Sequence, residues 1–362
     1  MRKITLLISL ILLASVANSQ EYRVEAGAWR INVDEATGKA SIAYNNNVVI
    51  AGNEAEWGLV NNKTTFSALT DIAVTSSDHQ DEFGVGKQIV VTGKTTQSPI
   101  TTVTHTYYVY GDKDYILTDV VLESEKTLEI NYIAPIRSTA SSKILDAGTN
   151  YFLYVPFDND GWTRYETKLF GDWHPTCYEV TVLFNNGTRR GVVAGSIQHD
   201  TWKTGVTAET AAETTLKSLL VFNGVATKDG TRDNDRHGAV KGTRVESSKM
   251  MVGCFDDWRR GMETYGDLCA IVHPKLPFRG AKPFGWNSWG TLQTNIKPAK
   301  AIGVSDFYAD ELKPLGFCGA DGVVYIGLDS YWNENFAVRD HGKFVKNCAA
   351  NGQYAGIYWA PF

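Results

Sequence analysis

Carboxylate, amide and indole side chains follow three apolar segments in the last quarter of the sequence. These segments end in Gly285-Trp286-Asn287-Ser288-Trp289, Leu328-Asp329-Ser330-Tyr331-Trp332 and Tyr358-Trp359-Ala360-Pro361. An indole face packs on the apolar C–H face of a pyranose ring, and a carboxylate beside it accepts hydrogen bonds from the sugar hydroxyl groups. The residue types therefore predict a sugar-binding site. They suit equally well tryptophans that pack a core and an aspartate that caps a loop.

Short strands carry these side chains. Residues Phe284–Ser288 are expected to form a short strand. Gly322–Leu328 and Tyr354–Trp359 have the pattern of strands buried on both faces of a parallel sheet. Apolar residues at helical spacing lie between the strands, namely Val304, Phe307, Tyr308, Leu312 and Leu315, and then Phe344, Val345, Cys348 and Ala349. Ser305 is the expected N-cap of the first helix and Gly316 its C-terminal stop. The order β-α-β-α-β predicts a parallel sheet, whose ligands bind at the carboxyl ends of the strands.

The chain before His273 has the pattern of strands and turns. Val103–Tyr110 and Tyr115–Leu122 flank a polar turn and predict one hairpin. Tyr178–Phe184 and Gly191–Ile197 flank Asn185-Asn186-Gly187-Thr188 and predict another, since an Asn-Gly pair supplies the positive φ of a tight turn. The spacing predicts an antiparallel β-sandwich. Two polar stretches, Asn45–Glu54 and Thr227–Gly242, are expected to be surface loops.

These patterns divide the chain into domains. We expect a β-sandwich domain over residues 20–273, a stiff basic linker with three prolines over 274–283, and a βα region over 284–362. A (β/α)8 barrel needs about 250 residues. Region 284–362 is therefore expected to be an incomplete (β/α)8 TIM barrel, its first three strands, with further barrel residues after Phe362.

The three strand ends resemble those of the melibiase or α-galactosidase clan of glycoside hydrolases. Gly285-Trp286-Asn287-Ser288-Trp289 followed by Asn295-Ile296 is similar to the opening strand of the clan barrel. Residues 325–332 are similar to its second strand, and residues 351–358 to its third. The β-rich N-terminal part is similar to the sandwich that several clan members carry ahead of the barrel.

The resemblance implies roles for several strand-end residues. Trp286 would line the sugar pocket, and Asp329 would accept hydrogen bonds from the hydroxyl groups of the terminal sugar. Ser330 stands where the clan usually has a second aspartate, so strict selection for galactose is not implied. The remaining predicted substrate-binding residues are Asn287, Trp332 and Tyr358.

The clan's catalytic pair is not expected within this chain. Clan members use a carboxylate nucleophile and a carboxyl acid/base, roughly 5 Å apart, and retain the anomeric configuration. By resemblance these groups lie on barrel strands four and six, beyond Phe362. No residue of this chain is therefore predicted to be catalytic, and the 362-residue chain is expected to be inactive by itself.

The resemblance leads to one function and leaves two alternatives open. The first is an exported glycoside hydrolase that acts on terminal α-galactosides or related glycosides with retention. The second is a noncatalytic carbohydrate-binding protein. The third is a raffinose-synthase-like transglycosylase, in which a sugar intercepts the covalent intermediate in place of water.

The N-terminus has the pattern of a secretory signal peptide over residues 1–19. Met1-Arg2-Lys3 is a positive n-region, Ile4–Val16 is apolar, and Ala17-Asn18-Ser19 is a small-residue cleavage site. The apolar run is short for a membrane span. The sequence predicts a periplasmic or secreted protein that is not bound to a membrane after cleavage.

Composition argues against several other classes. The net charge of −5 and the lack of a Lys/Arg run argue against nucleic acid as a partner. The seven histidines show no paired zinc spacing, and no Gly-rich phosphate loop occurs, so neither a metal nor a cofactor is expected. Five cysteines are too few for a disulfide framework; Cys254 could pair with Cys269, or the thiols could be free.

Three aspartate clusters outside the strand ends have two interpretations each. Asp158-Asn159-Asp160-Gly161-Trp162 and His199-Asp200-Thr201-Trp202 suit ordinary turns or loops that overhang a sugar site. Asp256-Asp257 suits an ion-pairing element between domains or a catalytic role, of which we expect the first.

Overall fold

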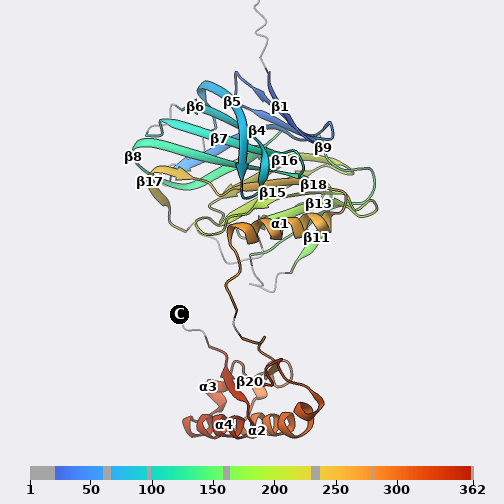
Figure 1. Cartoon of the computed structure of the whole chain (residues 1–362), viewed down its shortest axis with the longest axis vertical. Coiled ribbons are helices and arrows are strands. Elements are labelled where there is room, and N and C mark those ends of the chain that lie inside the picture. Colours follow the sequence, from blue (N-terminus) through green and yellow to red (C-terminus); the bar gives the residue numbers. More distant parts are fainter. Residues whose placement is uncertain are drawn as a thin grey trace, which may run out of the picture. The chain divides into compact units, whose positions relative to one another are not determined.

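The computed structural model describes residues 21–59, 67–95, 99–157, 164–229, 237–278 and 280–359. The predicted signal peptide and the cluster over residues 158–162 lie outside these ranges. The chain divides into two compact units, Met1–Lys275 and Leu276–Phe362. The first unit contains the antiparallel strands and the second a small parallel sheet with its helices (Figure 1).

Antiparallel strands make up most of the first unit. Their bounds are β1 Glu21–Ala26, β2 Trp29–Asp34, β3 Ala40–Tyr44, β4 Asn47–Leu59, β5 Thr70–Asp81, β6 Gly84–Lys94, β7 Thr102–Tyr110, β8 Tyr115–Ser138, β9 Ser142–Lys143, β10 Asn150–Tyr154, β11 Glu166–Leu169, β12 Cys177–Tyr178, β13 Val180–Asn185, β14 Gly191–Ser196, β15 Thr204–Thr210, β16 Thr215–Asn223, β17 Val240–Glu246 and β18 Met250–Phe255. Figure 1 shows these strands stacked in layers. The predicted antiparallel character of this region is confirmed.

The core of this unit follows from the period of two along its strands. In β2, Trp29, Ile31 and Val33 are buried while the residues between them are only partly covered. These three side chains join one apolar cluster with Tyr107 of β7 and Phe152 of β10. The cluster therefore joins strands that lie far apart in the sequence.

Both predicted hairpins are present. β7 pairs with β8 from Val109↔Ile116 to Thr102↔Glu123. β13 pairs with β14 from Phe184↔Gly191 to Val180↔Gly195. The positive φ of its turn lies at Arg189, with a value of 67°, and not at the predicted Asn-Gly pair. β8 is longer than the sequence predicts, because it runs on to Ser138 and pairs along its length with β4, β16 and β17 as well.

The predicted surface loop at Asn45–Glu54 is wrong. Only Asn45 and Asn46 form a turn, with φ values of 48° and 65°, and the rest belongs to β4. The Asn53 side chain is fully buried and donates to the Tyr107 hydroxyl and the Pro135 carbonyl at 3.0 and 3.1 Å. Partners more than 50 residues away in the sequence therefore hold this polar stretch in a strand.

Helix α1, Trp258–Val272, packs against β14 and β18 at the end of the first unit. Asp257 is its N-cap, and its carboxylate accepts a hydrogen bond from the Arg259 N–H at 3.1 Å. Gly261 permits the close approach, because a Cβ there would lie 2.6 Å from the Phe255 ring. Asp257 therefore caps a helix, and the Asp256 side chain is fully exposed.

The second unit is a parallel sheet with helices. Its elements are β19 Gly285–Asn287, η2 Gln293–Asn295, α2 Pro298–Phe307, η3 Tyr308–Leu312, η4 Lys313–Leu315, β20 Tyr325–Leu328, α3 Trp332–Asn335, α4 Val338–Ala350 and β21 Tyr354–Ile357. β20 pairs in parallel with β19 on one side and β21 on the other. Ile326, Phe344 and Cys348 belong to the apolar cluster of this unit. The predicted β-α-β-α-β order is confirmed. The predicted burial of the strands on both faces is wrong, because Tyr325 of β20 and Tyr354 of β21 are 39% and 59% exposed.

The first helix of this unit differs from the prediction. It begins at Pro298, so Ser305 lies in its interior and is not an N-cap. Ser305 is fully buried and its hydroxyl donates to Oε1 of Gln353 at 2.6 Å. Phe307 and Leu315, predicted to face the core, are exposed, whereas Gly316 ends the helical segment with a φ of 87° as predicted.

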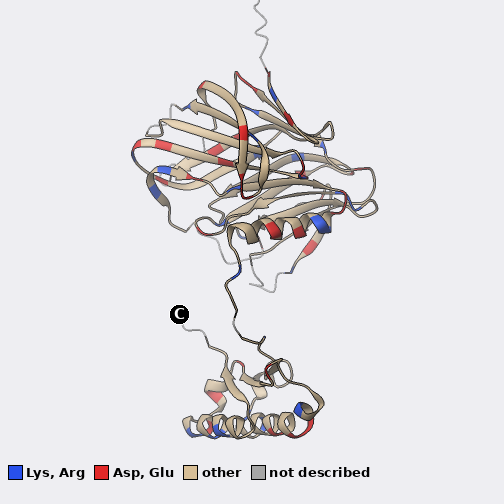
Figure 2. Ribbon diagram, viewed as in Figure 1, with Lys and Arg blue, Asp and Glu red and all other residues tan. Residues whose placement is uncertain are grey.

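Charges of both signs are interspersed along the described ribbon, and α1 carries acidic as well as basic residues (Figure 2). In the part of the chain that the structure describes, no helix has the length and apolar character needed to span a membrane.

Candidate functional site

The carboxyl ends of β19 and β20 bring Asn287 and Asp329 together. The parallel register pairs Asn287 with Gly327, so the end of β19 lies beside the residues that follow β20. Nδ2 of Asn287 donates to Oδ2 of Asp329 at 2.9 Å. Oδ1 of Asn287 in turn accepts the Trp289 N–H at 2.8 Å, which fixes the orientation of the amide.

Two neighbouring serines hold the Asp329 segment in place. The buried Ser288 hydroxyl oxygen accepts the backbone N–H of Asp329 at 2.9 Å. Oδ1 of Asp329 accepts the N–H of Ser330 at 2.8 Å. Each carboxylate oxygen thus has one protein donor, and a carboxylate has about four acceptor positions. The half-buried Asp329 therefore keeps acceptor capacity for hydroxyl groups of a ligand.

An open depression of about 520 Å³ is lined by the residues that follow Asp329, although Asn287 and Asp329 are not among its lining residues. Its lining consists of residues 330–334 together with Tyr358 and Trp359. The Trp332 indole N–H donates to the Tyr358 carbonyl at 2.7 Å and so links the segment after β20 to the end of β21. Tyr358 and Trp359 are 57% and 70% exposed, which leaves their rings available to an apolar ligand face.

A second aromatic pair lies at the same strand ends. The Trp289 and Tyr331 rings are stacked, with centroids 6.5 Å apart and an interplanar angle of 20°. Tyr331 has a φ of 71°, an unusual backbone conformation for a non-glycine residue. Tyr331, Asn333 and Glu334 were not predicted as site residues, because their placement depends on the turn that follows Asp329.

The predicted site residues thus fall into groups. Asn287 and Asp329 are hydrogen-bonded, and Ser330, Trp332 and Tyr358 line the depression. Trp286 is different, because it is half-buried and packs against the apolar cluster of the unit. Since side chains alternate along a strand, Trp286 and Asn287 lie on opposite faces of β19. Its sugar-binding role stays a prediction.

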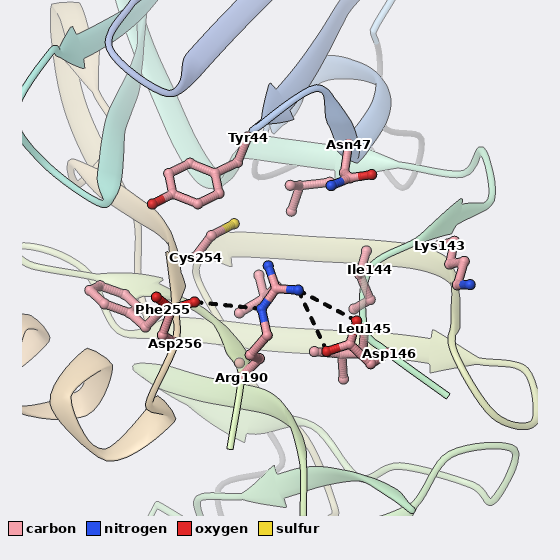
Figure 3. Close-up of a pocket in the computed structure, with 13 residues that line it drawn as sticks. Tyr44, Asn47, Lys143, Ile144, Leu145, Asp146, Arg190, Cys254, Phe255 and Asp256 are labelled. Carbon is pink, nitrogen blue, oxygen red and sulfur yellow. Dashed lines mark hydrogen bonds and ion pairs between the residues drawn. The ribbon is translucent and has the colours of Figure 1, made fainter. Parts of the chain in front are cut away.

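Another cavity, of about 190 Å³, lies in the first unit (Figure 3). The Arg190 guanidinium projects into it between two carboxylates, with Nη1 3.4 Å from Oδ1 of Asp146 and Nε 3.6 Å from Oδ1 of Asp256. Burial and a hydrogen bond to Asp114 raise the pKa of the Tyr44 phenol, and burial raises that of the Cys254 thiol. Ion pairs within the wall balance the charge of Arg190, and we assign no catalysis to this cavity.

Two residues of the His199-Asp200-Thr201-Trp202 motif, Thr201 and Trp202, line a separate cavity of about 300 Å³ in the first unit. Trp202 is 8% exposed and its indole N–H donates to the Glu246 carbonyl at 2.8 Å.

All five cysteines are free thiols, so the Cys254–Cys269 pairing that the sequence left open is not formed.

The fold is similar to those of solved glycoside hydrolases. A Glycoside Hydrolase Family 97 enzyme from Pseudoalteromonas sp. strain K8, in complex with acarbose, matches 93% of this chain and 53% of its own at 13% identity and a TM-score of 0.54. The galactosidase domain of an alpha-galactosidase-sucrose kinase, AgaSK, matches 95% of this chain and 57% of its own at 11% identity and a TM-score of 0.53. A GH36 alpha-galactosidase from Geobacillus stearothermophilus, in complex with stachyose, matches 94% and 56% at 11% identity and a TM-score of 0.50.

These comparisons concern the fold. The chain spans a little over half the length of the solved structures named above. No protein-family model matches it, and no curated protein is similar to it in sequence.

Proposed function

We propose that this chain belongs to an exported glycoside hydrolase of the α-galactosidase type, which cleaves terminal α-galactosides or related glycosides with retention. The observation that carries the proposal is the Asn287–Asp329 pair at the carboxyl ends of two parallel strands, followed directly in the sequence by residues that line an aromatic depression. Carboxyl ends of parallel strands are where barrel enzymes bind their substrates. The fold likeness to glycoside hydrolases supports the same function.

The uncovered face of the parallel sheet supports an incomplete barrel. Parallel sheets are normally covered on both faces. Here α2 and α4 pack together and cover one face, while Tyr325 and Tyr354, which the register pairs on the other face, are 39% and 59% exposed. In a closed barrel, inward side chains of this kind pack against those of the other strands. The proposal therefore takes β19, β20 and β21 as the first three barrel strands.

Asp329 has a binding role in this proposal. A retaining glycosidase needs two carboxyl groups about 5 Å apart on either side of the scissile bond. Both oxygens of Asp329 are engaged by neutral donors, Asn287 and the Ser330 N–H, an arrangement that orients a carboxylate acceptor. The proposal places the nucleophile and the acid/base on later barrel strands.

Sugar binding by the 362-residue chain tests the proposal. Methyl α-galactoside, with methyl α-glucoside in parallel, is titrated into the chain and followed by saturation-transfer NMR. We expect weak binding that Asp329→Asn removes. Asp321→Asn is the matched control, because Asp321 lies at the opposite end of β20, where its carboxylate accepts only the Val323 N–H among its hydrogen bonds in the described residues.

Three outcomes would contradict the proposal. Equal affinity of the parent chain and the Asp329→Asn variant for the sugar would show that the sugar does not bind at Asp329. Turnover of an aryl α-galactoside by the 362-residue chain would contradict the placement of the catalytic pair. Binding without turnover by a chain that includes the five further strands of the proposal would identify a noncatalytic carbohydrate-binding protein.

A further inference from the structure

A cysteine, a histidine and a glutamate form a hydrogen-bonded chain in the first unit, apart from the strand ends described above. Nε2 of His199 lies 3.4 Å from Sγ of Cys269. Nδ1 of the same ring lies 2.9 Å from Oε2 of Glu179. The three residues come from α1, from the turn after β14 and from the junction of β12 and β13.

Other contacts of the cluster fix each member in place. Oε1 of Glu179 accepts the Thr204 N–H at 3.1 Å, so one carboxylate oxygen is anchored to the sheet and the other is left for His199. Nε2 of His273 accepts the backbone N–H of His199 at 3.3 Å. The imidazole is therefore held between sulfur and carboxylate, and rotation about its side-chain bonds would break both contacts.

This order of groups is the one that activates a cysteine nucleophile. A base within hydrogen-bond reach takes the thiol proton, and a third group orients the base and stabilises its charged form. The hydrogen bonds to Cys269 and Glu179 raise the pKa of His199 to about 10. A protonated imidazole beside sulfur is a recognised feature of reactive cysteines.

Access to the cluster comes from the solvent side. The side chains of His199 and Glu179 are 33% and 31% exposed, and Cys269 is half-buried. Tyr265 lies one turn earlier on α1. Burial is the main cause that raises the pKa of its phenol, and the nearby Cys269 and Glu179 raise it further, so the hydroxyl stays protonated beside the sulfur. No group of side chains suited to hold a metal ion occurs in the described ranges, so the cluster is not assigned as a metal site.

We propose that Cys269 is a covalent modification site, at which its thiol exchanges with low-molecular-weight disulfides to form a mixed disulfide. The thiol proton resides on His199 as an imidazolium, and the Cys269 sulfur attacks one sulfur atom of the disulfide. A new S–S bond forms to Cys269 as the disulfide's own S–S bond breaks. The departing sulfur leaves as a thiolate and takes the proton from His199. Cys269 is oxidised and the departing half of the reagent is reduced, so electrons and protons balance.

Site-resolved thiol labelling tests the proposal. The reduced 362-residue chain is incubated with oxidised glutathione at neutral pH, the remaining thiols are alkylated, and each cysteine is quantified by peptide mass spectrometry. Cys318, also half-buried but in the other unit, is the internal reference. We expect Cys269 to form the mixed disulfide about tenfold faster than Cys318, because its base is in place.

Variants separate an activated thiol from a hydrogen-bonded contact that only holds α1 on the sheet. We expect His199→Gln to slow the exchange at Cys269 about tenfold, and Glu179→Gln to slow it less, because Glu179 acts only through His199. His341→Gln, in the other unit, should leave the rate at Cys269 unchanged. The buried Cys177, Cys254 and Cys348 report folding, since they would be labelled in an unfolded variant.

The results that overturn the proposal are defined by the same measurement. Exchange at Cys269 no faster than at Cys318 would show that the cluster is structural. A folded His199→Gln variant in which Cys269 exchanges at the parent rate would also show that the cluster is structural. If His199→Gln unfolds, Glu179→Gln decides, and an unchanged rate in that variant rejects the proposal.

Discussion

The Asn287 amide donates a hydrogen bond to the Asp329 carboxylate over 2.9 Å and so joins the ends of two neighbouring parallel strands. Asn287 is exposed and Asp329 half-buried, so the pair lies at the surface of the parallel-sheet unit. The amide restricts the carboxylate to one orientation. That restriction prepares Asp329 to accept ligand hydroxyl groups without first being ordered.

If Asn287 acts through Asp329, the two substitutions will not be additive. Asn287→Ala should weaken binding of methyl α-galactoside about two- to tenfold, the loss of one hydrogen bond. Asp329→Ala should remove binding, and the double variant should resemble Asp329→Ala. NMR titration of the four proteins measures the dissociation constants. If Asp329→Ala keeps measurable binding and the added Asn287→Ala substitution weakens it further, Asn287 makes an independent contact with the sugar.

Gly285 is expected to be essential for the pairing of β19 with β20. A Cβ at this position would lie 1.8 Å from the Tyr325 carbonyl oxygen, which belongs to the backbone of β20. Gly285→Ala should therefore destabilise the second unit by about 1–3 kcal/mol or more, because the strand must move. Gly290→Ala is the control, since its Cβ would meet no atom within 4 Å. Urea unfolding followed by tryptophan fluorescence compares the two, and equal stabilities would refute the strand register.

Asn53 should contribute strongly to the stability of the first unit. Its side chain donates to Tyr107 and Pro135 and accepts the Arg137 N–H at 3.0 Å. Asn53→Ala leaves these buried groups without that partner, which costs about 1–3 kcal/mol for each group left unsatisfied. Asn47→Ala, at the exposed start of the same strand, should change the free energy of unfolding by less than about 0.5 kcal/mol. Urea denaturation followed by circular dichroism measures both, and similar midpoints would contradict the buried network.

His105 should make the first unit sensitive to acid. It is buried against Thr118, with Nε2 2.9 Å from the hydroxyl oxygen, and burial lowers its pKa to about 3. In the unfolded chain the His105 ring is protonated below about pH 6.5, whereas in the folded state it stays neutral down to about pH 3. The stability that His105 contributes is thus complete above about pH 6.5 and is lost as the pH falls towards about 3.

Unfolding free energies measured across this window test the expectation. The parent should lose up to about 1.4 kcal/mol per pH unit for each such histidine. His174 acts in the same direction, because burial lowers its pKa to about 4. His105→Gln should flatten the slope by about one proton while lowering the stability at neutral pH. A parallel shift of the whole curve would show that His105 does not titrate in this way.

Local sequence patterns determined the strands and their order. The hairpins β7–β8 and β13–β14 followed from β-branched runs around turn residues, and the parallel strands from short apolar runs between helical patterns. These signals depend on residues close together in the chain. The strand-end residues with sugar chemistry were visible for the same reason, although their binding role remains a prediction.

Contacts between distant segments decided what the sequence left open or misplaced. Asn53 lies in a strand because its side chain forms hydrogen bonds with Tyr107, Pro135 and Arg137. Ser305 lies inside α2, where its hydroxyl group donates a hydrogen bond to Gln353. None of these four partners lies close enough in the sequence to be found from a local pattern.

The contact between His199 and Cys269 shows most clearly the difference between what the sequence predicts and what the tertiary structure decides. Sequence alone determined a strand-rich first unit, a parallel second unit and the residue types at its strand ends. Only the tertiary structure placed Glu179, His199 and Cys269, which are 20 and 70 residues apart along the chain, in one hydrogen-bonded chain. The physical reason is that periodicity and turn chemistry act over a few residues, whereas hydrogen-bond geometry requires the folded backbone to bring its partners within about 3 Å.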